Sequence, residues 1–426
     1  MFIGISFLWN ALYNIYIQHH SYRGDIFRTA IKEAILPFYM WSNPFSFTIP
    51  NLIFVVTSII YISIVLRLYS NFVNQKHYTL LLSCSWLLWV LTAGYTSGFD
   101  RLTGSYAHIQ TFANDMVKFN SITDLLLNYV NLQPSLDIHG QHYPPGFLIL
   151  LKSMGITFSR CLIYLCGMGS ILMTYTLAIK LELSSKAAFL SATLLASAPG
   201  LLIFSSIDIA PIIIMLSLMV VYFFLHMINH KSTIAIIGFV LCVSLLVLFS
   251  FIISVLFLFI AIYLFYEKKV QTNKVQIINL SLCAVLIVSS FYLLYITTKF
   301  NIYSCFISSI SENMKLNKSN GFDDLSRYLF RSSCNILQFI ITCGFMFFFI
   351  RFKSTVVFFK SIIPTLFIAA FSGLFFCETE RSWLLLLPFI AIILAQYIQT
   401  IQSKKTIIAL SILISSVIEL CFDHFH

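Results

Sequence analysis

The sequence predicts an all-α, polytopic integral membrane protein with about 11 to 13 transmembrane helices, each needing roughly 20 apolar residues. Its residues are 59% hydrophobic and only 10% charged, whereas soluble domains carry about 25% charged residues. The mean hydropathy is +0.90, and apolar runs recur along nearly the whole chain. So few charges cannot solvate a globular surface. We therefore expect one transmembrane domain, residues 1–426, with no large soluble domain.

The formal net charge of +10 could indicate nucleic-acid binding. In a membrane protein, however, excess lysine and arginine is typical of cytoplasmic loops, so we expect no nucleic-acid partner. The ten cysteines form no Cys-x-x-Cys pair and no Cys/His metal spacing. We expect neither a metal nor a cofactor.

Most apolar runs have the length of one helix. Met1–Ile17 is expected to be a retained first helix, followed by an interfacial amphipathic segment in 21–50. The run Ser232–Phe265 is too long for one span at about 1.5 Å per residue, and predicts two short helices joined near Ser250. Further spans are expected at 51–66, 78–96, 161–179, 187–204, 209–227, 277–296, 336–350, 356–376, 383–397 and 406–421.

Two polar intervals, 98–143 and 298–331, interrupt the apolar pattern. The first includes Ile122, Leu125, Leu126, Tyr129 and Val130 at helical spacing, which predicts an amphipathic surface helix.

The first interval closes on Asp137-Ile-His-Gly-Gln-His-Tyr-Pro-Pro-Gly146. Because proline fixes its own φ and disfavours helix at the preceding residue, we expect His139 and His142 to lie on a stiff, non-helical turn at the membrane boundary. The following segment, Phe147–Phe158, is expected to be a half-helix that does not span.

The orientation follows from the positive-inside rule. If the spans alternate, one face receives Arg67/Lys76, Lys180/Lys186, Lys231, Lys268/Lys269/Lys274, Arg351/Lys353 and Lys404/Lys405. The extracytoplasmic face then receives Gly98–Tyr143, Pro199–Asp208, Thr298–Arg331 and Cys377–Arg381, and with them most of the acidic residues. Segment 21–50, with three basic residues, also falls outside unless Met1–Ile17 does not span.

Two carboxylates of the first interval are candidate general bases. Asp100 directly follows a span, where a carboxylate can accept a proton from a hydroxyl that approaches along the membrane; alternatively, it only pairs with Arg101. Asp115 lies deeper in the interval and is the second candidate, unless it is a solvated loop acid.

Basic side chains at the same boundary could bind an anion. His139 and His142 alone make a weak metal site. His142 could contact a phosphate or a hydroxyl, or the turn could be purely structural. Arg381 could hold a phosphate with its planar fork, or pair with Glu378 or Glu380 and join two helices.

Asp208 follows an apolar run and the Ser197-Ala198-Pro199 turn. It is a candidate contact for a bound polar group, with a structural role as the alternative.

These motifs resemble those of the GT-C superfamily of membrane glycosyltransferases. His142-Tyr143-Pro144-Pro145-Gly146 is similar to the His-Pro-Pro element of the protein-mannosyltransferase and aminoarabinose-transferase branch, with Tyr143 inserted. Glu378-Thr-Glu-Arg-Ser-Trp383 resembles the Glu-Arg-x-Trp segment of several bacterial members, and the Ser-x-Pro turn before Asp208 also fits. One departure is that Asp100 follows the third expected helix rather than the first, and has no paired acid nearby.

The resemblance implies an inverting hexosyl- or pentosyltransferase that moves a sugar from a polyprenyl-phosphate donor to a hydroxyl of a lipid, glycan or protein acceptor. It places the active face on the extracytoplasmic or lumenal side of a bacterial inner membrane or a eukaryotic endoplasmic reticulum membrane. Asp100 or Asp115 would be the catalytic base, and His142 and Arg381 would bind the donor phosphate. Substrate contacts would come from His139, Tyr143, Asp208, Glu378 and Glu380, with no metal.

Two other classes stay open. A transporter or lipid flippase would carry charges near the bilayer midplane and often internal repeats, neither of which is evident in this sequence. A non-catalytic membrane subunit with the same fold is the third alternative.

Overall fold

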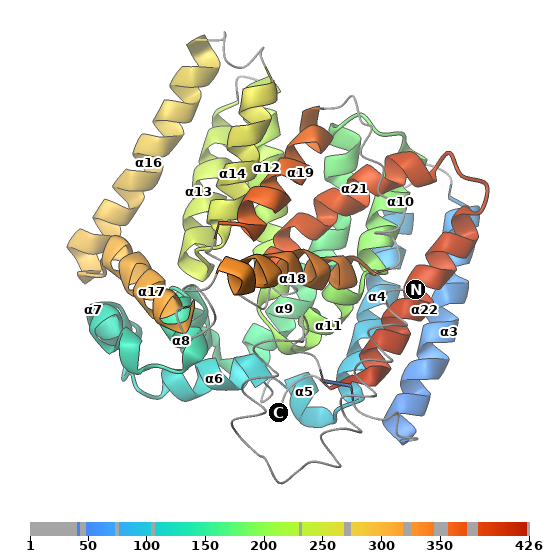
Figure 1. Ribbon diagram of the computed structural model, residues 1–426, viewed down its shortest axis with the longest axis horizontal. Coiled ribbons are helices and arrows are strands. Elements are labelled where there is room, and N and C mark those ends of the chain that lie inside the picture. The colour runs from blue at the N-terminus through green and yellow to red at the C-terminus, as the bar shows by residue number, and fades with distance from the viewer. Residues whose placement is uncertain are drawn as a thin grey trace.

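The computed structural model describes residues 41–42, 48–72, 76–103, 107–229, 232–267, 274–317, 325–344, 357–372 and 382–423. These are helical almost throughout (Figure 1), which confirms the predicted all-α class. The exception is a two-residue antiparallel pair, β1 (Trp41–Ser42) with β2 (Phe422–Asp423). The expected first helix, Met1–Ile17, lies outside the described residues.

The helices follow one another with short connections. In chain order they are α3 (Ile49–Ser70), α4 (Lys76–Tyr95), α5 (Phe99–Thr103), α6 (Ala107–Met116), α7 (Ile122–Leu132), η2 (Gln133–Ser135), α8 (Ile138–His142), α9 (Gly146–Lys180), α10 (Ser185–Ala196), α11 (Pro199–Ile207), α12 (Ala210–Asn229), α13 (Thr233–Phe249), α14 (Ile253–Tyr266), α16 (Lys274–Thr298), α17 (Ile302–Asn317), α18 (Leu325–Cys343), α19 (Val357–Ala370), η5 (Trp383–Leu386), α21 (Leu387–Ile398) and α22 (Lys404–Cys421).

Five helices of the described chain are long and apolar enough to cross a membrane: α3, α4, α9, α12 and α16. The bent pair of α10 and α11 would make a sixth. The predicted number of 11 to 13 is therefore larger than the structure shows. Several apolar runs form helices of only 10–17 residues, among them α13, α14 and α21 with η5.

The break predicted near Ser250 is confirmed. Helix α13 ends at Phe249, Ser250 is extended (φ −163°, ψ 135°), and α14 begins at Ile253. The Ser250 hydroxyl accepts a hydrogen bond from the Ile252 N–H at 3.3 Å and so supports the turn.

Helix α9 is also divided. Its 35 residues would extend about 50 Å at 1.5 Å per residue, much more than a bilayer core of about 30 Å. At Gly155 the backbone leaves the helical region (φ 76°, ψ 170°), a conformation that essentially only glycine adopts. A short first section of α9 therefore precedes the main helix, as the predicted half-helix requires, but it ends at Gly155 instead of Phe158.

The run 187–204, predicted as one span, is divided into two helices, and Pro199–Asp208 is mostly helical. Helix α10 ends at Ala196, and α11 begins at Pro199 with a bend of 51°. Proline has no N–H to donate and keeps Ala198 extended (φ −78°, ψ 134°). Every residue of α11 is buried.

The helix ends are segregated. Figure 1 shows the end of α3, the start of α10 and the start of α22 at one end of the bundle, and α5 to α8 with α17 at the opposite end. Basic residues lie at the first end, because Arg67 is in the last turn of α3, Lys186 is the second residue of α10 and Lys404 is the first residue of α22. The two predicted polar intervals contact each other, because α17 packs on α7, η2 and α8. We call α5 to α8 with η2 and α17 the polar layer.

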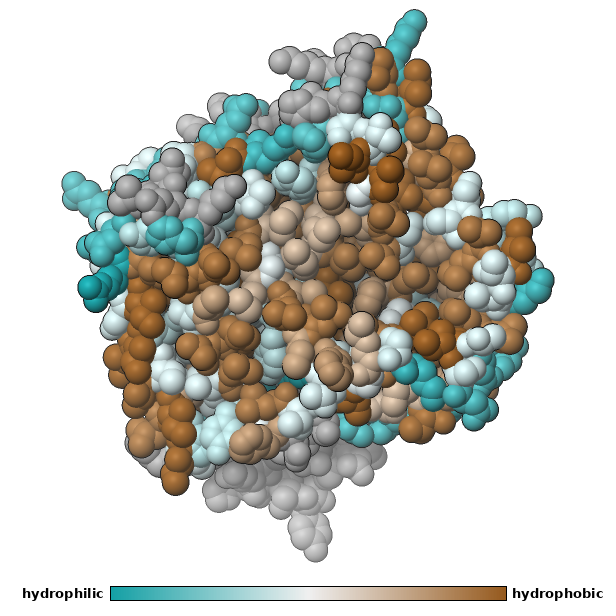
Figure 2. Space-filling model, turned by 180° about the vertical axis from the view of Figure 1, so that it is seen from behind, coloured by the Kyte–Doolittle hydropathy of each residue, from teal (hydrophilic) through white to brown (hydrophobic). Residues whose placement is uncertain are grey.

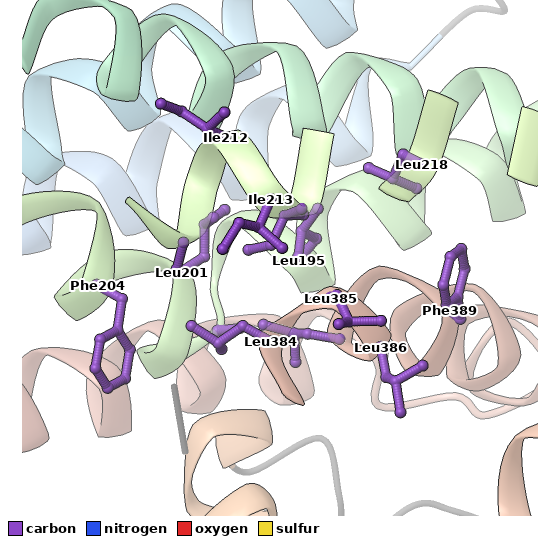
Figure 3. Close-up of a cluster of buried hydrophobic side chains, with 14 of the residues drawn as sticks. Leu195, Leu201, Phe204, Ile212, Ile213, Leu218, Leu384, Leu385, Leu386 and Phe389 are labelled. Atoms are coloured by element: carbon purple, nitrogen blue, oxygen red, sulfur yellow. The ribbon is translucent and has the colours of Figure 1, made fainter. Parts of the chain in front are cut away.

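The core lies where α9, α10, α12 and α21 meet. Figure 3 shows leucine and isoleucine side chains of α10, α11 and α12 packed against η5 and α21. The outer helices are different: in α16 only Cys283 is buried. Figure 2 shows a broad apolar surface across the middle of the molecule, with hydrophilic residues toward its margins. Lipid-facing helices have such a surface.

Candidate functional site

The segment with the two histidines is helical, contrary to the expected non-helical turn. Helix α8 covers Ile138–His142, and the Tyr143 N–H donates to the His139 carbonyl at 2.9 Å. Proline restricts only the residue directly before it, so the extended backbone begins at Tyr143 (φ −99°, ψ 151°). Helix α9 then starts at Gly146.

Tyr129 and Gln133 connect this segment to its surroundings. The buried Tyr129 hydroxyl lies 2.8 Å from the Gly140 carbonyl oxygen and 2.6 Å from that of Tyr143. Nε2 of Gln133 donates to the Gln141 carbonyl and to the Ser309 hydroxyl of α17, both at 2.9 Å. These hydrogen bonds tie the histidine segment to the rest of the first polar interval and, through Gln133, to α17 of the second.

Asp115 is fully buried, so it is not a solvated loop acid. Its carboxylate accepts hydrogen bonds from the Asp137 N–H at 2.9 and 3.1 Å and pairs with Lys118 at 2.8 Å. Gly140 leaves room for it, because a Cβ there would lie 2.3 Å from the Asp115 carboxylate. Burial raises the pKa of the Asp115 carboxyl, while Lys118 and the Asp137 N–H act in the opposite direction. Asp115 therefore joins α6 to α8.

His139 and Tyr143 pack as an aromatic group. The His139 ring, which is buried, stacks on Phe112 with a centroid separation of 5.8 Å. The Tyr143 ring meets Phe112 edge-on at 5.8 Å and His139 at 6.3 Å. Both predicted substrate contacts thus lie beside α6, near Asp115.

His142 has one ring nitrogen bound and one without a partner. Its Nδ1 lies 2.6 Å from the Ile138 carbonyl oxygen. Because a carbonyl only accepts, Nδ1 carries a proton. Its Nε2 is buried and finds no hydrogen-bond partner in the part of the chain that the structure describes. A neutral His142 offers a lone pair there, and a protonated one offers an N–H.

Asp100 is the second residue of helix α5. This helix follows α4 and Gly98, whose backbone has a positive φ (98°). The neighbouring Arg101 is fully buried and pairs with Glu419 of α22 at 2.9 Å. Arg101 also donates from Nε to the Ser206 hydroxyl at 2.9 Å and from Nη1 to the Ser97 hydroxyl at 3.2 Å. The described carboxylate partner of Arg101 is thus Glu419, a residue far away in the sequence.

A second arginine joins this group. Arg160, in α9, is 2% exposed, and its Nη2 donates to the Arg101 carbonyl at 2.8 Å, to Tyr164 Oη at 3.2 Å and to the Ser206 carbonyl. Asp208, predicted as a substrate contact, is buried two residues after Ser206, and its Oδ1 accepts from the Ile209 N–H. We call Arg101, Arg160, Ser206, Asp208 and Glu419 the buried charge cluster.

The structure therefore places the predicted residues in two groups. Asp115, His139, His142 and Tyr143 come together around α6 and α8. Asp208 belongs to the buried charge cluster. Arg101 of α5 is part of the same cluster, because it donates to Ser206. Glu378, Glu380 and Arg381 lie outside the described residues.

The sequence reasoning missed Arg160 and Glu419. The available signal was a charged residue inside a predominantly apolar run, since such residues are costly in a membrane and usually have a function or a partner.

Within the described residues, no group of three or more His, Cys, Asp or Glu side chains has an arrangement that could hold a metal ion. Comparison of the chain with models of known protein families, with curated proteins and with solved structures finds no match.

Proposed function

We propose that the chain is a membrane glycosyltransferase of the GT-C type, which moves a sugar from a polyprenyl-phosphate donor to a hydroxyl of a lipid, glycan or protein acceptor. The observation that supports this most is the polar layer: two intervals far apart in sequence pack together at one end of an apolar helix bundle. Candidate acid–base and anion-binding side chains gather in that layer. A transferase that takes its donor from the bilayer needs such groups at the depth of the lipid phosphate.

The proposed chemistry is an inverting displacement at the anomeric carbon. Asp100 or Asp115 accepts the proton of the acceptor hydroxyl while the polyprenyl phosphate departs. His142, whose Nε2 has no hydrogen-bond partner among the described residues, and Arg381 offset the charge that develops on the phosphate. His139, Tyr143, Asp208, Glu378 and Glu380 contact the substrates. The hydrogen bonds that already occupy the Asp115 carboxylate favour Asp100 as the base.

The polar layer would face the extracytoplasmic or lumenal side of a bacterial inner membrane or an endoplasmic reticulum membrane. The basic residues at the opposite end of the bundle support this orientation. A topology of 11 to 13 spans would include the short apolar helices and the segments outside the described residues.

A transporter or lipid flippase is the second candidate. The fully buried Arg101–Glu419 pair favours it, because charges inside a helix bundle often mark the path of a polar substrate through the membrane.

One assay separates the two functions. The purified protein is reconstituted into liposomes that contain a radiolabelled polyprenyl-phosphate sugar and a panel of hydroxyl acceptors. We expect label to leave the donor lipid and appear in a glycosidic product. Movement of intact donor between the leaflets without product would instead establish the flippase.

A further inference from the structure

Arg160 is a buried guanidinium with unused donors. It is 2% exposed, and the hydrogen bonds of its side chain to described residues are all made by Nη2, to Arg101, Tyr164 and Ser206. Its Nε and Nη1 are buried and have no hydrogen-bond partner among the described residues. A guanidinium has five N–H donors, so most of the donors of this side chain have no acceptor in the part of the chain that the structure describes.

The charge of Arg160 has no salt bridge in the described structure, although the Asp208 carboxylate of the same cluster attracts it from a longer distance. The one carboxylate that pairs with an arginine of the buried charge cluster is Glu419, and it pairs with Arg101 at 2.9 Å. No described carboxylate lies within salt-bridge distance of Arg160. The face of the Tyr164 ring, 4.9 Å from the guanidinium carbon, offers only a cation–π contact. Buried N–H donors without an acceptor are costly, and Nε and Nη1 of Arg160 have none among the described residues, so a group with several acceptor oxygens is the expected occupant.

The location indicates which anion. Helices α4, α11 and α22 reach the buried charge cluster near their last residues, at the end of the bundle where the polar layer lies. Helix ends of membrane proteins lie near the headgroups, which is the depth of a lipid phosphate. Phosphate oxygens are also the preferred partners of guanidinium donors.

We propose that Arg160 binds the phosphate of a membrane lipid through Nε and Nη1. Only the identity of the lipid rests on the proposed function. If that function is correct, the lipid is the polyprenyl-phosphate donor. Arg101 stays neutralised by Glu419 and holds the Ser206 end of α11 in place, so that Arg160 is the arginine left for the ligand.

The test measures thermal stabilisation of the full-length protein in detergent by a short-chain polyprenyl phosphate, the corresponding polyprenol and inorganic phosphate. We expect the wild type to be stabilised by the phosphorylated lipid and not by the alcohol. Arg160→Gln should lose at least tenfold in apparent affinity. The matched control is Arg67→Gln, an exposed arginine at the opposite end of the bundle, which should bind like the wild type.

Each of the other possible results of this binding test either supports the proposed phosphate site or overturns it. Equal stabilisation by inorganic phosphate would support the phosphate site and assign it to a free ion. No difference between polyprenyl phosphate and polyprenol in the wild type, or unchanged affinity in Arg160→Gln, would overturn the proposal. The wild-type comparison applies even if Arg160→Gln does not fold. Sugar transfer with unchanged donor affinity in Arg160→Gln would refute this inference alone, and Arg160-dependent lipid binding without transfer would refute the transferase alone.

Discussion

At the scale of single residues, the main feature is the fully buried ion pair of Arg101 with Glu419. It connects α5, the short helix directly after α4, to α22 near the end of the chain. Breaking a buried pair by removing one partner leaves an uncompensated charge, at a cost of about 3–5 kcal/mol. The pair therefore fixes the position of the helix that also carries Asp100.

Glu419→Gln should lower the free energy of unfolding by about 3–5 kcal/mol for that reason. The control is Glu312→Gln, because Glu312 pairs with Lys315 at 2.6 Å in a pair whose lysine is 67% exposed. Exposed pairs contribute at most about 1 kcal/mol. Unfolding of both variants in detergent would be compared, and equal losses would contradict the assigned role of Glu419.

The pH dependence of stability tests the environment of Asp115. Burial raises the pKa of this carboxyl above 3.8. Between 3.8 and the raised value, the folded protein holds the proton more often than the unfolded chain. Stability contributed by this group is thus lost as the pH rises through that window. The free energy of unfolding of the wild type minus that of Asp115→Asn should therefore decrease as the pH rises through this range.

Asp124 provides the control of opposite sign. Hydrogen bonds from the Asn120 N–H and from Asn128 lower the pKa of Asp124. The same difference measured with Asp124→Asn should decrease as the pH falls through the lowered value. A curve for Asp115 with the sign of that for Asp124 would contradict the inferred burial.

Neither the Arg101–Glu419 pair nor the position of Arg160 was predictable from the sequence. Local patterns report on neighbours three or four positions apart along a helix, whereas this pair joins helices at distant positions in the chain. Composition indicated that charges in apolar runs matter, and the folded structure was needed to show which of them meet.

At the scale of elements, length and proline explain where the predictions succeed and fail. The break near Ser250 was predictable because the apolar run exceeds one membrane crossing. The amphipathic helix α7 followed from its spacing. The bend before α11 was missed because 187–204 was predicted as one span, although proline is common at the first position of a new helix.

Gly155 gives a prediction for α9. A Cβ at this position meets no atom within 4 Å, but φ is 76°. Gly155→Ala should therefore cost about 1–3 kcal/mol through backbone strain alone. The control is Gly169→Ala, where the added Cβ meets only the flexible end of Met215, at 3.1 Å. A thermal midpoint for Gly155→Ala equal to that of the wild type would show that α9 is not broken there.

At the scale of the whole molecule, the segregation of the helix ends supports one orientation in the membrane. The polar layer should be extracytoplasmic, and the end with Lys405 should be cytoplasmic. Single cysteines at the exposed positions Ser135 and Lys405, on a cysteine-depleted background, would be labelled from outside intact cells. We expect labelling at Ser135 alone, and labelling at Lys405 alone would invert the topology.

The all-α class with several helices long and apolar enough to cross a membrane was predictable from composition, because the chain carries few charges and many long apolar runs. The number of spans was not, because an apolar run can fold as one long helix, as two short helices or as a bent pair with nearly the same hydropathy. The gathering of Asp115, His139 and His142 was only partly predictable. Their shared interval was visible, while the burial of Asp115 depends on α8 packing against α6.

The proton-acceptor role of Asp100 tests the central claim most directly. Asp100→Asn keeps the size of the side chain but cannot accept a proton at neutral pH. In the liposome assay with a polyprenyl-phosphate sugar, this variant should turn over roughly a hundredfold more slowly than the wild type, with donor affinity unchanged. Asp124→Asn, in the same layer, should keep normal turnover. Near-normal turnover in Asp100→Asn with loss in Asp115→Asn would move the base to Asp115, and normal turnover in both would contradict the proposed transferase mechanism.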